Sequence, residues 1–193
     1  MEKIVVYGGG FNPPTVAHQA IMAECLRLPD ADGVWVMPSG ERTDKHFRLD
    51  DTDRLAMLQI VRETCFNSDP RLKISTFEID YAPRPSQTWR TIEALERQFP
   101  NTQFQYVFGA DSYYDMPNWQ RGVELQKKLG MLLVPRFELP VPCAPNVTPL
   151  PVQIDCPVSS TIVREHIARG FSINYLVCEG VRSYISDCRL YTE

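Results

Sequence analysis

The stretch from Tyr7 to His18, YGGGFNPPTVAH, carries residue types that suit an anion-binding corner. Its three consecutive glycines let the backbone turn sharply and approach a ligand closely. Thr15 is a good helix N-cap, and the helix that it would begin offers free N–H groups to an anion. Because His18 follows three residues later, the two side chains share one helix face. Together these groups predict a phosphate site.

Other interpretations of this stretch stay open on its residues alone. A dinucleotide-binding G-x-G-x-x-G fits poorly, because Pro13 stands in the place of the third glycine. A G-x-x-x-x-G-K-[ST] phosphate loop is absent from the sequence. The simplest alternative is a strand-to-helix turn in which the glycines only make the corner and His18 is an ordinary helix histidine.

A second helix start offers similar chemistry. Ser159, Ser160 and Thr161 are N-cap types, and Arg164 follows within one helical turn. Hydroxyls, free N–H groups and a guanidinium suit a polyphosphate, although serine and threonine also serve as simple caps. Lys45, in a polar loop, adds a third positive charge to the candidates.

The chemistry that the chain lacks is also informative. Its three histidines come with no serine elbow, and no cluster of carboxylates is typical of a two-metal site. A phosphate that attacks a phosphoryl group is already an anion and needs no general base. Such a reaction requires reactants held in line and charge stabilised on the phosphorus and on the leaving pyrophosphate. The sequence therefore favours phosphoryl chemistry over acyl transfer.

Composition limits the class of protein. A length of 193 residues predicts a single domain over 1–193, with a C-terminal helical part at about 159–193. Apolar and charged fractions of 44% and 23% are ordinary for a soluble globular protein. The net charge of −4 argues against a general binder of nucleic acid or of membrane surfaces. The sequence contains no run of about 18 apolar residues, so it predicts no membrane span.

The six cysteines form no C-x-x-C motif, and no secretion signal precedes the first apolar run. We therefore expect a cytoplasmic protein with reduced thiols. A disulfide between Cys143 and Cys156 stays open as an alternative.

Strands and helices alternate along the chain, which predicts a doubly wound, Rossmann-like α/β fold. We expect a parallel sheet of about five to six strands with helices on both faces. Apolar runs predict strands at 3–7, 34–37, 72–79, 104–108, 131–134 and near 152–154. Periodicity and caps predict helices at 15–28, 51–65, 86–99, 123–129, 159–169 and 175–185, with a short helical region broken at 116–119. Ligands of such sheets bind beyond the carboxyl ends of the strands, where the glycine stretch would lie.

In this order, the motifs resemble those of nucleotidyltransferases with an [HT]-x-G-H signature, specifically nicotinate or nicotinamide mononucleotide adenylyltransferases. Residues 8–18 resemble G-G-x-F-[DN]-P-x-[HT]-x-G-H, and residues 38–45 resemble P-x-G-x-x-x-x-K. Residues 86–88 resemble S-Y-T, and residues 109–119 resemble G-A-D-S with a following P-x-W. Residues 159–164 resemble S-S-T-x-I-R. Residues 175–177 and 184–191 continue the match, so the resemblance covers nearly the whole chain.

The resemblance implies transfer of AMP from ATP to nicotinate mononucleotide, or to nicotinamide mononucleotide, with release of pyrophosphate in NAD biosynthesis. It implies Mg²⁺ held mainly by ATP phosphates and water, with no protein metal site. The catalytic groups that it implies are His18, Thr15, Lys45 and Arg164. The implied ATP-binding residues are Gly8, Gly9, Gly10, Phe11, Thr15, His18, Gly109, Asp111, Ser159, Ser160, Thr161 and Arg164. The implied pyridine-nucleotide residues are Asn12, Lys45, Thr88 and Trp119, with the ring stacked on the indole.

Four positions depart from the family pattern. Thr15 replaces a histidine common in the bacterial nicotinate branch, and Ala17 replaces the motif glycine. Asp44 precedes Lys45 where histidine is frequent, and Cys178 replaces a proline. These changes bear on substrate preference and rate more than on fold. Two alternatives therefore stay open. One is a pantetheine-phosphate adenylyltransferase, because the motif with Thr15 also resembles the motif of that enzyme. The other is a non-catalytic nucleotide-binding module. A homo-oligomer is compatible with the sequence.

Overall fold

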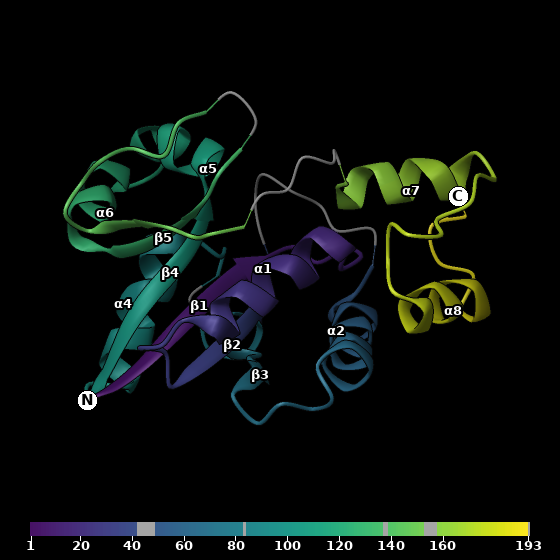
Figure 1. The fold of residues 1–193 in the computed structure, drawn as a ribbon, viewed down its shortest axis with the longest axis horizontal. Coiled ribbons are helices and arrows are strands. Elements are labelled where there is room, and N and C mark those ends of the chain that lie inside the picture. Colours follow the sequence, from purple (N-terminus) through teal and green to yellow (C-terminus); the bar gives the residue numbers. More distant parts are fainter. Residues whose placement is uncertain (42–48, 83, 137–138, 153–157, 193) are drawn as a thin grey trace.

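The structure is a computed structural model that describes residues 1–41, 49–82, 84–136, 139–152 and 158–192. In these residues six parallel strands form one sheet in the order β3-β2-β1-β4-β5-β6. The strands are β1 (Glu2–Gly9), β2 (Gly33–Pro38), β3 (Leu72–Ile74), β4 (Thr102–Gly109), β5 (Gly130–Val134) and β6 (Val147–Pro149). The chain builds one half of the sheet outward from β1 and the other half outward from β4 (Figure 1). This order confirms the doubly wound, Rossmann-like fold and puts its switch point between β1 and β4.

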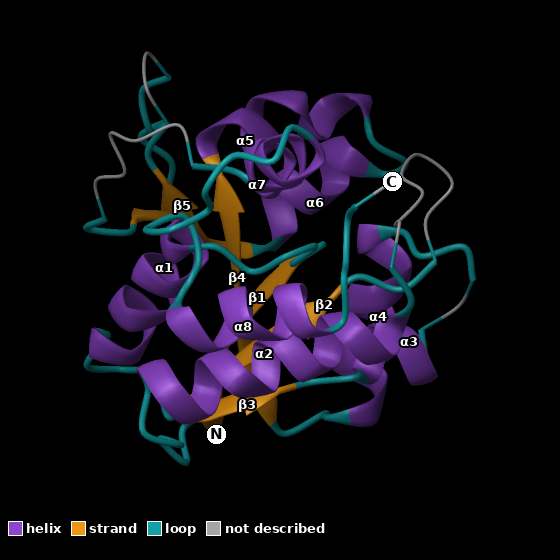
Figure 2. Cartoon of the chain, turned by 90° about the vertical axis from the view of Figure 1, so that its right-hand side faces the viewer, coloured by secondary structure: helices purple, strands orange, loops and turns teal. Residues whose placement is uncertain are grey.

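Helices cover both faces of the sheet. They are α1 (Val16–Arg27), α2 (Asp51–Cys65), α3 (Phe77–Asp80), α4 (Thr88–Gln98), α5 (Ala110–Asp115), the 3-10 helix η1 (Met116–Asn118), α6 (Gly122–Lys128), α7 (Ser160–Ala168) and α8 (Glu179–Asp187). Helix α8 packs against α2, and Figure 2 shows the two helices side by side in front of the strands. The described helices include none long and apolar enough to cross a membrane.

The alternation of side chains along β1 divides the core in two. Val5 and Tyr7 belong to a cluster with buried residues of α1, α2, α7 and α8. Ile4 and Val6 belong to a second cluster with buried residues of α3, α4 and α6. Successive residues of a strand point to opposite faces, so a continuous apolar run is what a strand buried on both faces needs.

Two predicted elements differ from the structure, and a third lies mostly outside the described residues. The strand predicted at 72–79 ends at Ile74, because Ser75 and Thr76 lead into the short helix α3, whose backbone at Phe77 donates to the Ser75 hydroxyl. The last strand of the described residues lies at Val147–Pro149, where Asn146 O accepts from Met131, whereas most of the strand predicted near 152–154 lies outside the described residues. The last helix begins at Glu179, four residues later than predicted.

Helix α2 has the predicted bounds, but one of its buried side chains was not expected. Arg54 is 0% exposed, whereas the apolar residues Leu55 and Ile60 of the same helix are only half-buried. The Arg54 guanidinium donates to Gly10 O at 3.0 Å and to Ser39 O at 2.7 Å, and it also binds Asp51. It therefore joins the segments that follow β1 and β2, a role that hydrophobic periodicity does not reveal.

Candidate active site

The start of α1 fixes the imidazole of His18. Thr15 is the N-cap residue, and its backbone N–H donates to His18 Nδ1 at 2.9 Å. The Thr15 hydroxyl lies 2.8 Å from the same nitrogen. A backbone N–H can only donate, so Nδ1 carries the lone pair and the neutral ring has its proton on Nε2. Thr15 is 0% exposed, so this structure gives it a role in holding His18.

The surroundings keep this histidine neutral. Burial, and to a lesser extent the positive charge of Arg136, lower the pKa of His18 from 6.5 to about 4. At neutral pH the side chain therefore offers an uncharged N–H donor and no free base. Such a donor suits developing negative charge on a phosphate oxygen.

The turn between β1 and α1 is tightly packed and strained. Phe11 has a φ of +46°, which is uncommon for a residue with a side chain, and it is 1% exposed. Its ring packs edge-on against Tyr7 at 5.4 Å and against His18 at 5.1 Å between ring centroids. Phe11 thus supports the imidazole, while Gly8 remains exposed and Gly9 half-buried at the end of β1.

The start of α7 lies directly against this turn. Ser159 caps the helix by accepting from the backbone of Ile162 at 3.3 Å. The Ser160 hydroxyl donates to Pro13 O at 2.8 Å. Arg164 donates to Asn12 O at 2.6 Å and to the Thr161 hydroxyl at 3.1 Å. The two helix starts that the sequence singled out are therefore brought together, although they are about 145 residues apart in the chain.

The carboxyl end of β4 contributes an acid and the neighbouring strand an arginine. Gly109 is the N-cap of α5, and Asp111 lies exposed in the first turn. Arg136, just after β5, places Nε 3.5 Å from Asp111 Oδ1. Arg136 was not among the residues predicted from the sequence, although it follows the predicted strand 131–134 by two residues, and ligands of such sheets bind beyond the carboxyl ends of the strands.

Trp119 lies at a half-buried position after η1. Its indole N–H donates to Asp115 Oδ2 at 2.7 Å, and its ring meets Phe108 edge-on at 6.1 Å. Hydrogen bonds from Asn118 and then from Trp119 lower the pKa of the Asp115 carboxyl. The carboxylate therefore fixes the orientation of the indole, whose neighbours Pro117, Gly122 and Lys127 line an open hollow of about 490 Å³.

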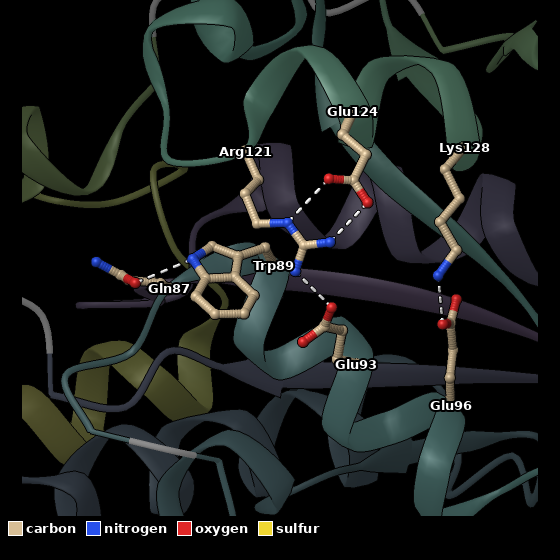
Figure 3. A network of polar contacts seen from close by, with 7 residues as sticks. All are labelled: Gln87, Trp89, Glu93, Glu96, Arg121, Glu124 and Lys128. Atoms are coloured by element: carbon tan, nitrogen blue, oxygen red, sulfur yellow. Dashed lines mark hydrogen bonds and ion pairs between the residues drawn. The ribbon is translucent and has the colours of Figure 1, made fainter.

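Thr88 is the first residue of α4. Its neighbours Gln87 and Trp89 belong to a network of polar contacts that reaches Arg121 and Glu124 (Figure 3). The Arg121 guanidinium lies over the Trp89 ring at 4.9 Å from the centroid. Arg121 also donates to Glu93 at 2.5 Å and to both carboxylate oxygens of Glu124. Trp89 in turn donates to Gln87 at 3.1 Å, so α4 and the start of α6 are linked around one cation.

Lys45 and Asp44 fall outside the described residues, as does Cys156. The five described cysteines are Cys25, Cys65, Cys143, Cys178 and Cys188, and all are free thiols. Among the described residues, no group of three or more His, Cys, Asp or Glu side chains is placed to hold a metal ion.

Comparison with known proteins places the chain among the nucleotidyltransferases. The chain belongs to the cytidylyltransferase-like family, whose model matches residues 6–166.

Individual relatives narrow the class further. The chain is 34% identical over 199 residues to the "probable nicotinate-nucleotide adenylyltransferase" of Geobacillus kaustophilus, covering 99% of this chain and 87% of the relative. It is 28% identical over 194 residues to the nicotinate-nucleotide adenylyltransferase of Bacillus subtilis, covering 99% of each. The solved Plasmodium falciparum nicotinic acid mononucleotide adenylyltransferase, complexed with NaAD, superposes with a TM-score of 0.84 at 21% identity and covers 99% of this chain and 98% of its own. That likeness supports the fold.

Proposed function

We propose that this protein is a nicotinate-nucleotide adenylyltransferase that moves AMP from ATP to nicotinate mononucleotide and releases pyrophosphate. The observation that carries the proposal is the meeting of two helix starts, those of α1 and α7, beside the turn at residues 10–13. The α7 start presents backbone N–H groups of its first turn. The α1 start, where Val16 N–H donates to Leu176 O, presents the neutral imidazole donor of His18. The choice of nicotinate mononucleotide as the substrate is supported by the names of the two bacterial relatives.

The reaction is an in-line displacement at phosphorus. A phosphate oxygen of the mononucleotide attacks the α-phosphorus of ATP, a P–O bond forms, and the bond to the leaving pyrophosphate breaks. No proton has to be removed from the nucleophile, which agrees with a His18 that is neutral and has its acceptor nitrogen engaged by Thr15. His18 Nε2–H and the α7 start would stabilise charge on the transferred phosphoryl group and on pyrophosphate.

Cationic side chains complete this arrangement. Arg164 keeps further N–H donors besides those bound to Asn12 O and Thr161, and these would contact ATP phosphates. Arg136 adds a second guanidinium near His18 and Asp111. Lys45, proposed from the sequence, would add a third charge.

Mg²⁺ fits this reaction as an ion that arrives with ATP. Apart from Asp111, whose carboxylate lies 3.5 Å from Arg136 Nε, the groups that converge on the site, such as His18 Nε2–H and the guanidiniums, are donors and cations that bind phosphate oxygens and not metal ions. The ion would be held by phosphate and water oxygens and would neutralise part of their charge.

The pyridine nucleotide would bind between the segments that carry Thr88 and Trp119. The indole is held by Asp115, and its ring face would stack on the pyridine. Asn12, within the turn at residues 10–13, would help to place the mononucleotide.

A direct assay tests the proposal. Pyrophosphate release is measured with ATP and each of three acceptors: nicotinate mononucleotide, nicotinamide mononucleotide and phosphopantetheine. We expect the highest kcat/KM with nicotinate mononucleotide and the matching dinucleotide on chromatography. Turnover with phosphopantetheine alone would show the other adenylyltransferase class, and ATP binding without any dinucleotide would show a non-catalytic module.

A further inference from the structure

The turn at residues 10–13 is held by donors from distant parts of the chain. Gly10 O accepts from Arg54, Asn12 O from Arg164, and Pro13 O from Ser160. Three main-chain carbonyls are thus fixed by α2 and α7. The turn needs such support because Phe11 is left-handed, and strained conformations persist only where the surroundings hold them.

The side chain of Asn12 is held by a fourth donor. Tyr191, in the segment after α8, donates its hydroxyl to Asn12 Oδ1 at 2.6 Å. Each of the two residues is only 6% exposed, and they are 179 positions apart in the sequence. Short-range sequence patterns therefore cannot reveal this contact.

The segment after α8 is itself shaped to bring Tyr191 to this point. Arg189 and Tyr191 have φ values of +51° and +63°, both in the left-handed region that side chains disfavour. The backbone of Leu190 is anchored by donation to Ile185 O at 2.9 Å. The ring of Tyr191 then packs in the same buried cluster as Phe11. Two unfavourable backbone conformations are thus maintained around one residue whose hydroxyl reaches the turn.

We propose that Tyr191 is a positioning residue of the active site: through Asn12 it sets the turn on which Phe11 supports His18. Without the hydroxyl, Asn12 Oδ1 would be a buried acceptor with no donor, a state that proteins avoid by rotating the group or admitting water. Either response loosens the residue next to Phe11, whose ring contacts the imidazole. The effect on catalysis rests on the function proposed above.

A matched pair of variants tests this inference. Tyr191→Phe removes the hydroxyl and keeps the buried ring. Tyr184→Phe makes the same change on α8, where the hydroxyl donates to Asp53 at 2.8 Å instead of to the turn. We expect Tyr191→Phe to lower kcat by about 10-fold or more, since small misplacements of catalytic groups are costly in rate. The KM for ATP should stay close to that of the parent, and Tyr184→Phe should retain the parent kcat.

A double-mutant cycle with Asn12→Ala sharpens the result. If the hydroxyl acts through Asn12, removing it in the Asn12→Ala background should cause no further loss of kcat. Fully additive losses would overturn the proposal. So would a Tyr191→Phe variant with the parent kcat, or equal losses of kcat in both tyrosine variants.

A spectroscopic measurement separates this proposal from the proposed function. The ¹⁵N and ¹H resonances of the His18 ring should shift in Tyr191→Phe and stay in place in Tyr184→Phe. An unmoved His18 ring in Tyr191→Phe would refute the positioning role, whatever the activity. A parent protein that is inactive with every acceptor, combined with a shifted ring, would reject the proposed function and keep the positioning role.

Discussion

Replacing His18 by asparagine separates the structural role of the ring from its chemical role. The carbonyl oxygen of asparagine can accept from the Thr15 backbone, as Nδ1 does at 2.9 Å. The variant therefore keeps the cap of α1 but loses both the Nε2–H donor and the titrating group. Loss of one preorganised donor lowers kcat by about 10²–10³-fold. The same variant should change how stability depends on pH.

The size of the pH effect follows from the pKa of His18. The folded pKa of about 4 lies below the ordinary histidine pKa of 6.5, so between these pH values the unfolded chain binds a proton that the folded chain does not. The stability supplied by neutral His18 is complete above pH 6.5 and is lost as the pH falls toward 4. At 1.36 kcal/mol for each pH unit, the difference amounts to about 3 kcal/mol.

Urea unfolding at several pH values measures this quantity. The free energy of unfolding is determined for the parent and for His18→Asn from pH 7 down to pH 4, in one buffer system of constant ionic strength. Carboxylates titrate in both proteins, so their contribution cancels in the difference between the two curves. We expect the parent to lose about 3 kcal/mol more than the variant over this range.

Two results would refute the reasoning. Parallel curves for the two proteins would mean that His18 has the same pKa folded and unfolded. A steeper loss in the variant would mean that the histidine is protonated in the folded state. A kcat/KM profile with a limb near pH 6.5 that disappears in His18→Asn would also refute the reasoning, because the pKa of the folded His18 ring would then lie near 6.5.

Three further substitutions test other parts of the site. Trp119→Ala should raise the KM for the pyridine nucleotide and leave the KM for ATP unchanged, as the loss of uniform binding does; an effect confined to ATP in steady-state kinetics would contradict this assignment. Arg54→Ala should lower the free energy of unfolding in urea by about 3 kcal/mol, because it leaves two loop carbonyls without their buried donor, and a loss below about 1 kcal/mol would show that the loops are held otherwise. Gly122→Ala would put Cβ 1.6 Å from the backbone oxygen of Met116, so we expect a loss of about 2 kcal/mol or more by the same measurement; unchanged stability would mean that the turn adapts freely.

Much of the fold follows from apolar periodicity. The helices at α1 and α2 and the strands β1, β2, β4 and β5 lie where their patterns predict them, because each buries a continuous run or a regular stripe. The pattern fails at the edges of the sheet, where β3 and β6 have only three residues each. Edge strands are decided by pairing partners and by local side-chain bonds, and neither is visible in a window of sequence.

The site was predictable where residue type and spacing carry the chemistry. Thr15 and His18 are three residues apart, and the structure joins them as their spacing suggests. Arg54 and Tyr191 could not be found in this way. The turn residues that they bind, Gly10 and Asn12, lie 44 and 179 residues away in the sequence. The sequence shows which groups can bind phosphate, whereas tertiary contacts decide which groups hold them in place.

The threonine at position 15 now has a physical explanation. The Thr15 hydroxyl lies 2.8 Å from Nδ1 of His18, and the Thr15 backbone N–H donates to the same nitrogen. His18 therefore has only its Nε2–H to offer a substrate. Arg164 is likewise anchored by Asn12 O, and Asn12 by the hydroxyl of Tyr191. Each of these groups is oriented by a hydrogen bond that it makes within the protein. Such an arrangement suits a reaction accelerated by preorganised donors, in which a free base would have no proton to remove.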